Sequence, residues 1–149
     1  MLSEIEVANE RLPIRESLKR EMEVAWTRLA SAGTWWTGAE RLAIAAEARY
    51  ALDCDLCRQR KKTLSPYAVD GEHDALDELP DGVVEAIHRL VTDAGRITNN
   101  WLRSLHIAET HYVESIGAIA DMTGLATLHS ALGPALPSLH DPISSPPKR

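Results

Sequence analysis

The chain has 149 residues, enough for one domain with its own hydrophobic core. Its formal charge of −6 argues against the clustered positive surface that binds nucleic acid, so no nucleic-acid partner is expected. No apolar span of about 18 residues occurs, and Glu4, Glu6 and Glu10 stand where a signal peptide would be basic and then apolar, so we expect no membrane partner and a cytoplasmic location.

Two helices are predicted in the first third of the chain. Large apolar side chains recur every three or four positions from about residue 13 to residue 32, with Pro13 and Gly33 suited to the two ends of a helix. The charged dozen residues before it are expected to form an arm or a short helix. Thr37 and Glu40, three residues apart, predict a capping box that begins the second helix.

The second helix is almost wholly apolar from Leu42 to Ala48, so we expect it to be surrounded on most sides. Glu47 is the exception, and no cation stands three or four positions away to form an ion pair within the helix. Two interpretations stay open. Either the carboxylate points to solvent or pairs across helices, or it is a partly buried acid that faces the thiols that follow.

Both cysteines of the chain, Cys54 and Cys57, come directly after this helix. Asp53 is suited to cap a third helix with Cys54 in its first turn, where free N–H groups, Arg58 and Lys61 would favour thiolates. The spacing of three places both sulfurs on one face, within reach of a disulfide after modest adjustment. It is also the spacing of half a zinc site, which needs two further ligands.

An acidic segment from residue 67 to residue 80 predicts a loop. We expect His73 in this loop to be exposed, or else to take part in an active site or a metal site. Asp81 begins a fourth helix that reaches about residue 94, with His88 at the boundary of its buried face.

A short helix around residues 99–105 precedes a long last helix from about residue 109 to residue 132, which Gly133 and Pro134 end. His129 lies on the inner stripe of the last helix as either a core residue or a catalytic one. The fold class predicted is all-α: a compact bundle of about six helices over residues 1–133, with the Cys-x-x-Cys at a helix N-terminus. Residues 134–149 are rich in proline and predict an extended or disordered tail.

Three segments together resemble the alkylhydroperoxidase D-like (AhpD-like) and carboxymuconolactone decarboxylase superfamily. They are residues 36–44, residues 54–57, and residues 112–117 with 129–133, so that the family core would cover about residues 35–133. The resemblance implies antiparallel helices that assemble into dimers, trimers or hexamers. It also implies a peroxidatic Cys57 and a resolving Cys54, which would condense to a disulfide that a thiol reductant reopens.

The family's proton relay uses a Glu and a His at positions that hold Leu42 and Lys61 here. Glu47 is the nearest alternative acid, and His129 or His73 would supply the base from elsewhere in the chain.

The leading hypothesis is a thiol-dependent, peroxidase-like antioxidant or disulfide oxidoreductase, with peroxide or another small molecule as substrate. Its partners would be a thiol reductant and further copies of the chain, with no cofactor and no metal. Its catalytic candidates are Cys54, Cys57, Glu47, His129 and His73. A second hypothesis is a non-redox decarboxylase-like enzyme or small-molecule-binding protein of the same fold. A third is a zinc-stabilised interaction module that uses the two cysteines and histidines such as His73.

Overall fold

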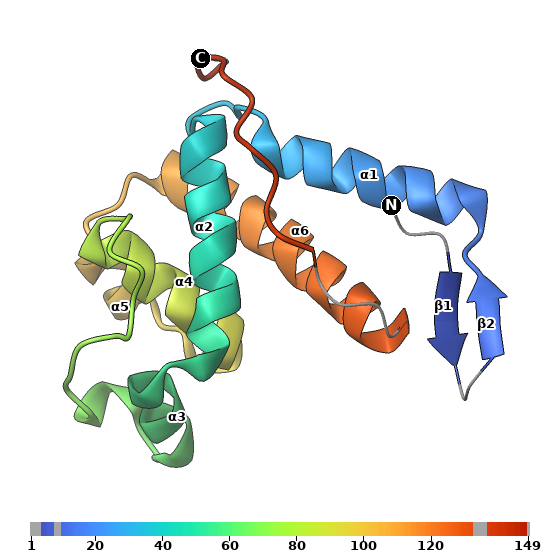
Figure 1. Ribbon diagram of the computed structural model, residues 1–149. Coiled ribbons are helices and arrows are strands. Elements are labelled where there is room, and N and C mark those ends of the chain that lie inside the picture. Colours follow the sequence, from blue (N-terminus) through green and yellow to red (C-terminus); the bar gives the residue numbers. More distant parts are fainter. Residues whose placement is uncertain (1–3, 8–9, 133–136, 149) are drawn as a thin grey trace.

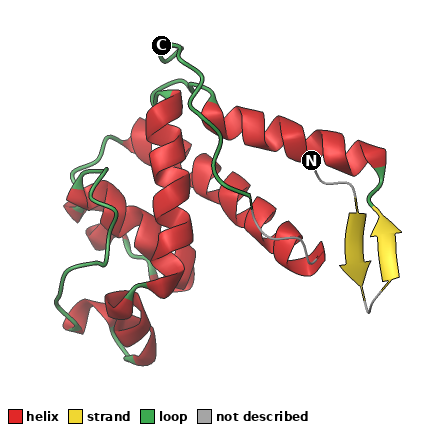
Figure 2. Ribbon diagram, viewed as in Figure 1, coloured by secondary structure: helices red, strands yellow, loops and turns green. Residues whose placement is uncertain are grey.

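The computed structural model describes residues 4–7, 10–132 and 137–148, with side chains described from residue 14 onward. Figures 1 and 2 show a helical fold, as the sequence predicts. Its six α-helices in the described part are α1 (Glu16–Ala30), α2 (Gly38–Tyr50), α3 (Asp55–Lys62), α4 (Asp81–Asp93), α5 (Asn99–Ser104) and α6 (Glu109–Leu132). Short 3₁₀ turns η1 (Ala51–Asp53), η2 (Pro66–Ala68) and η3 (Ala94–Arg96) lie between them.

A small antiparallel hairpin, β1 (Glu4–Val7) and β2 (Glu10–Pro13), precedes the helices. The register places Glu4 opposite Pro13 and Val7 opposite Glu10. The short helix, one of the two structures expected here, is therefore not what these described residues form. Pro13 ends β2 rather than beginning α1, because proline lacks the N–H that a further strand bond would need.

Helix α2 is the centre of the fold and packs against α1, α4 and α6 (Figure 1). Ile44 and Ala45 of α2 are fully buried, which confirms that this apolar helix is surrounded on most sides. The capping box is confirmed as well. The Thr37 side chain accepts the N–H of Glu40, and the Glu40 carboxylate accepts the N–H of Thr37 at 2.8 Å.

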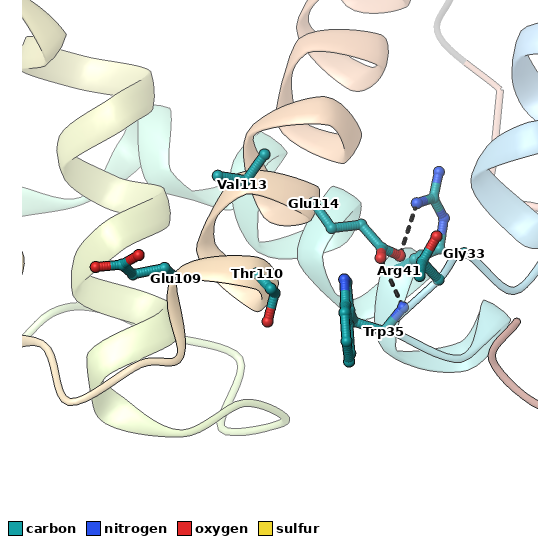
Figure 3. Close-up of a pocket in the computed structure, with 8 residues that line it drawn as sticks. Gly33, Trp35, Arg41, Glu109, Thr110, Val113 and Glu114 are labelled. Atoms are coloured by element: carbon teal, nitrogen blue, oxygen red, sulfur yellow. Dashed lines mark hydrogen bonds and ion pairs between the residues drawn. The ribbon is translucent and has the colours of Figure 1, made fainter. Parts of the chain in front are cut away.

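The loop between α1 and α2 is held by a carboxylate from α6. Glu114 accepts the N–H of Trp35 at 2.7 Å and forms an ion pair with Arg41 at 3.1 Å, beside a pocket of about 560 Å³ (Figure 3). A Cβ at Gly33 would lie 1.7 Å from Glu114 Oε1, so only glycine permits this approach. Because Arg41 and Glu114 are almost fully shielded from water, the pair joins α2 to α6 firmly.

The C-terminal segment lies against the helices without helical or strand structure in residues 137–148. The N–H of Ile143 donates to the carbonyl of Ala30 at 2.8 Å, and that of Lys148 to the carbonyl of Gly33 at 2.9 Å. The division of the chain at residue 133 stays a prediction, because residues 133–136 lie outside the described part. No described helix is long and apolar enough to cross a bilayer.

Gly82, in the first turn of α4, lies tight against the end of α5. A Cβ there would be 2.1 Å from the carbonyl oxygen of Leu105, and relief would require a backbone shift. We therefore expect Gly82→Ala to lower the free energy of unfolding by about 1–3 kcal/mol. Gly117→Ala is the matched control, because a Cβ added there would meet no described heavy atom within 4 Å apart from its chain neighbours and its own helix backbone. Alanine favours a helix more than glycine does, so the control should raise the free energy of unfolding by up to about 1 kcal/mol. Urea denaturation measures both changes. Equal effects of the two changes would contradict the contact.

Candidate functional site

Four side chains converge where α3, α4 and the loop between them meet. The Sγ of Cys54 lies 3.5 Å from Nδ1 of His73, and the Sγ of Cys57 lies 3.6 Å from the same nitrogen. Cys57 Sγ is also 3.4 Å from Nδ1 of His88. All four donor atoms lie within 4.8 Å of one another, and both cysteines are free thiols. The structure thus brings two thiols and two imidazoles into one cluster.

The local backbone explains why both thiols face the same way. The turn η1 continues directly from α2, so the chain changes direction at Cys54, whose extended φ and ψ of −67° and 123° make it the N-cap of α3. Cys57 follows one turn later on the same face. The prediction that Asp53 caps this helix was wrong, because η1 includes Asp53; Asp74 of the loop instead accepts the Asp55 N–H at 2.9 Å.

Glu47 reaches the cluster through a histidine. Its Oε1 lies 2.7 Å from Nε2 of His88, and its Oε2 accepts the N–H of Leu76 at 3.0 Å. Glu47 and His88 are 1% and 0% exposed. Glu47 is therefore a buried acid that pairs across helices, and the histidine it pairs with contacts Cys57. Since both Oε atoms are used, this carboxylate fixes the His88 ring and the loop together.

Glu85 of α4 does the same for the second histidine. It lies 2.6 Å from Nε2 of His73 and accepts N–H groups from Trp101 at 2.8 Å and Arg60 at 2.9 Å. Each histidine of the cluster thus presents Nδ1 to sulfur and Nε2 to a carboxylate. The acid sets the ring orientation in both cases, and for a neutral ring it also sets the tautomer.

The two imidazoles are charged differently. Their ring centroids are 4.1 Å apart, so two adjacent cations would repel each other. Burial is the largest influence on His73 and opposes its charge, but contacts with Cys57, Glu85 and Cys54 outweigh it and raise its pKa to about 10. Burial, with a smaller contribution from the positive charge of His73, lowers the pKa of His88 despite its bond to Glu47. His73 is the cation of the cluster and His88 the neutral base.

The His73 cation helps to lower the pKa values of Cys54 and Glu85. Burial raises the pKa of Cys54 most strongly, but the N–H groups of Cys57 and Asp74 and the His73 ring favour the thiolate, and the net direction is downward. Burial also opposes ionisation of Glu85, but its bonds to His73, Trp101 and Arg60 lower its pKa to about 2. The cluster therefore stabilises a thiolate beside an imidazolium.

A pocket of about 440 Å³ leads to the histidine edge of the cluster. His73 and Glu85 form part of its wall, while Cys54 and Cys57 lie behind them at 0% and 4% exposure. A small molecule in this pocket would meet the imidazole of His73 before the sulfurs.

Three side chains expected to act on the thiols are not part of the cluster. His129 of α6 is buried against Trp26 of α1, with ring centroids 6.4 Å apart, and does not belong to the four-donor cluster. Arg58 is exposed and paired with Asp55, and Lys61 is exposed. The expected positive potential from these side chains is replaced by His73, since a cation inside the cluster acts more strongly than two in solvent.

His88 and Glu85 were missed, and His88 is fully buried rather than at the edge of its helix face. The spacing Glu85-x-x-His88 was the available signal, because residues three apart on a helix lie on one face. That spacing alone does not show that the face turns toward the cysteines.

No family model, curated protein or solved structure that was compared with the chain matches it. The AhpD-like resemblance, assembly into oligomers and the cytoplasmic location therefore stay predictions.

Proposed function

We propose that the protein is a thiol-dependent oxidoreductase with peroxidase-like activity, in which Cys57 attacks the peroxide and Cys54 resolves. The observation that carries this proposal is the chain of contacts from Glu47 through His88 to Cys57. Nδ1 of His88 is 3.4 Å from the sulfur and Nε2 is 2.7 Å from the carboxylate. A nucleophile beside a base that a third group orients is the usual arrangement for activating a thiol.

The first step oxidises Cys57. Glu47 holds the ring proton of His88 on Nε2, which leaves the lone pair of Nδ1 directed at the thiol to take its proton. The thiolate attacks one peroxide oxygen, the O–O bond breaks, and the departing alkoxide takes the proton back from the imidazolium. The products are a sulfenic acid on Cys57 and an alcohol, with the sulfur oxidised and the peroxide reduced by two electrons.

The second step uses Cys54. Its thiolate attacks the sulfenic sulfur of Cys57, an S–S bond forms, and hydroxide leaves and is protonated to water. His73 contacts both sulfurs, at 3.5 Å and 3.6 Å, so it serves as the proton donor for that departure. A cellular dithiol then reduces the disulfide and restores both thiols.

Peroxide consumption with dithiothreitol as reductant tests the assignment of the two thiols. Cys57→Ser should reduce the rate to that of buffer with reductant, because the attacking sulfur is lost. Cys54→Ser should still react once with organic hydroperoxide and then accumulate a sulfenic acid that dimedone traps. Turnover retained by Cys57→Ser, or sulfenic acid found on Cys54 in that variant, would show that the assignment is wrong.

A further inference from the structure

We propose that Cys54, Cys57, His73 and His88 bind one zinc ion as a closed four-ligand site. The inference concerns the site of the proposed function but does not depend on that activity. It rests on the spacing of the four donor atoms, on what holds each histidine from behind, and on the charge of the pocket beside them.

Three of the six distances between the donor atoms match the edges of a zinc tetrahedron. With Zn–S bonds of about 2.3 Å and Zn–N bonds of about 2.0–2.1 Å, tetrahedral angles place sulfur and nitrogen about 3.6 Å apart. The three sulfur–nitrogen distances found are 3.5, 3.6 and 3.4 Å. The other three distances are at most 4.8 Å, so side-chain rotations would bring all four atoms to one ion.

The acids behind the histidines complete the arrangement. A zinc-binding histidine usually donates its other ring N–H to a carboxylate or carbonyl, which fixes the ligand nitrogen. Glu47 does this for His88 at 2.7 Å and Glu85 does it for His73 at 2.6 Å. A metal site with two histidine ligands would use both of these pairs.

The donor chemistry selects the ion. Zinc binding displaces the thiol protons and the Nδ1 proton of His73, so the donors become two thiolates and two neutral imidazoles. That set favours zinc, while magnesium and calcium prefer oxygen ligands. Two thiolates balance the charge of Zn²⁺, so the complex is suited to a place where Cys54 and His88 are fully buried. Because four protein donors fill the tetrahedron, no position remains for water or substrate, and the bound ion would be structural rather than catalytic.

The pocket beside the cluster provides a route for a cation. Its described wall includes the acids Glu72, Asp77, Asp81 and Glu85, and no Lys or Arg, next to the ligand His73. Negative charge gathered in a cleft raises the local concentration of cations. Zinc would therefore reach the thiols from the side where His73 is partly accessible.

Titration of reduced, metal-free protein with Co²⁺ tests the site, because tetrahedral cobalt bound by thiolates is strongly coloured. We expect saturation at one Co²⁺ per chain, with sulfur-to-cobalt charge-transfer and tetrahedral ligand-field bands that Zn²⁺ abolishes. Weak, six-coordinate spectra or no saturation would overturn the proposal.

Variants identify the ligands. His73→Ala should weaken zinc binding at least 100-fold. Glu85→Gln should weaken it about 10–100-fold, because it removes the carboxylate that bonds to Nε2 of His73. Glu78→Gln, which removes an exposed acid of the same loop outside the pocket wall, is the matched control and should leave the affinity unchanged. Circular dichroism checks that each variant is folded. Equal affinity of His73→Ala and the wild type would overturn the four-ligand site, even if the cysteines alone bind metal.

The peroxide assay separates the two proposals. Turnover without cobalt binding overturns only the zinc site. Cobalt binding with no turnover by the metal-free protein overturns only the thiol peroxidase.

Discussion

Replacing Glu47 by alanine should lower the free energy of unfolding by about 3–5 kcal/mol, a large part of the stability of a domain of this size. The change removes a buried carboxylate and leaves two donors, the N–H of Leu76 and the Nε2–H of His88, without an acceptor. Each buried group left unpaired costs about 1–3 kcal/mol, more if it is charged. Urea denaturation of the reduced protein measures the loss.

Glu47→Gln makes this prediction specific to the hydrogen bonds. A glutamine has one acceptor and one donor at its tip, whereas both neighbours of Glu47 donate. Glutamine can accept from one of these donors and not from the other. The free energy of unfolding of Glu47→Gln should therefore lie between those of the wild type and Glu47→Ala. Glu78→Ala removes an exposed acid of the loop that carries Leu76, and it should change the free energy of unfolding by less than about 0.5 kcal/mol. A Glu47→Ala protein as stable as this control would refute the buried network.

Zinc should slow oxidation of the thiol pair by about 100-fold when free zinc is at 100 times its dissociation constant. The two proposals use the same sulfurs, and at that concentration about 1% of the protein has no metal and can react. The same mass action adds about 2.7 kcal/mol to the free energy of unfolding. Thiol loss after hydroperoxide is added, at a series of buffered zinc concentrations, measures the protection.

Glu85→Gln serves as the internal comparison for zinc protection. Since its affinity should fall about 10–100-fold, the protection curve should shift to higher zinc by the same factor. An oxidation rate independent of zinc, in protein whose cobalt spectrum shows full occupancy, would contradict competition for the two sulfurs.

Local features of the fold were readable from the sequence because neighbours in the chain determine them. The capping box at Thr37, the apolar surroundings of α2 and the start of α3 beside the two cysteines depend on spacings of three or four residues. The hairpin was not readable, because its pairing depends on contacts across strands. Asp74 could not be foreseen as the partner of the Asp55 N–H, since its loop returns to α3 after 19 residues.

The candidate site could be predicted from the sequence only in part. Glu47 stood out because an acid within an apolar helix requires a partner, but the sequence did not name it: His88 lies 41 residues away on α4. His129 was proposed as a catalytic candidate but does not belong to the cluster. Its position on the inner stripe of α6 was correct, yet a stripe does not show which neighbour it faces, and that neighbour includes Trp26.

The relay proposed here differs from the one that the family resemblance implies. Leu42 and Lys61 occupy the positions of the relay acid and histidine, and they lie in the core and in solvent, respectively. We propose that Glu47, further along the same helix, and His88, from α4, supply the acid and the base instead. The chemistry requires a base at the sulfur and a group to orient it, not particular positions in the chain.

The intact mass and thiol count of reduced, metal-free protein, before and after one equivalent of organic hydroperoxide, test the central claim most directly. We predict that both thiols disappear and that the mass falls by two hydrogens without crosslinks between chains, because Cys54 and Cys57 form a disulfide within the chain. Two thiols still present after the peroxide is added, or oxygen gained without a disulfide, would contradict a dithiol redox centre.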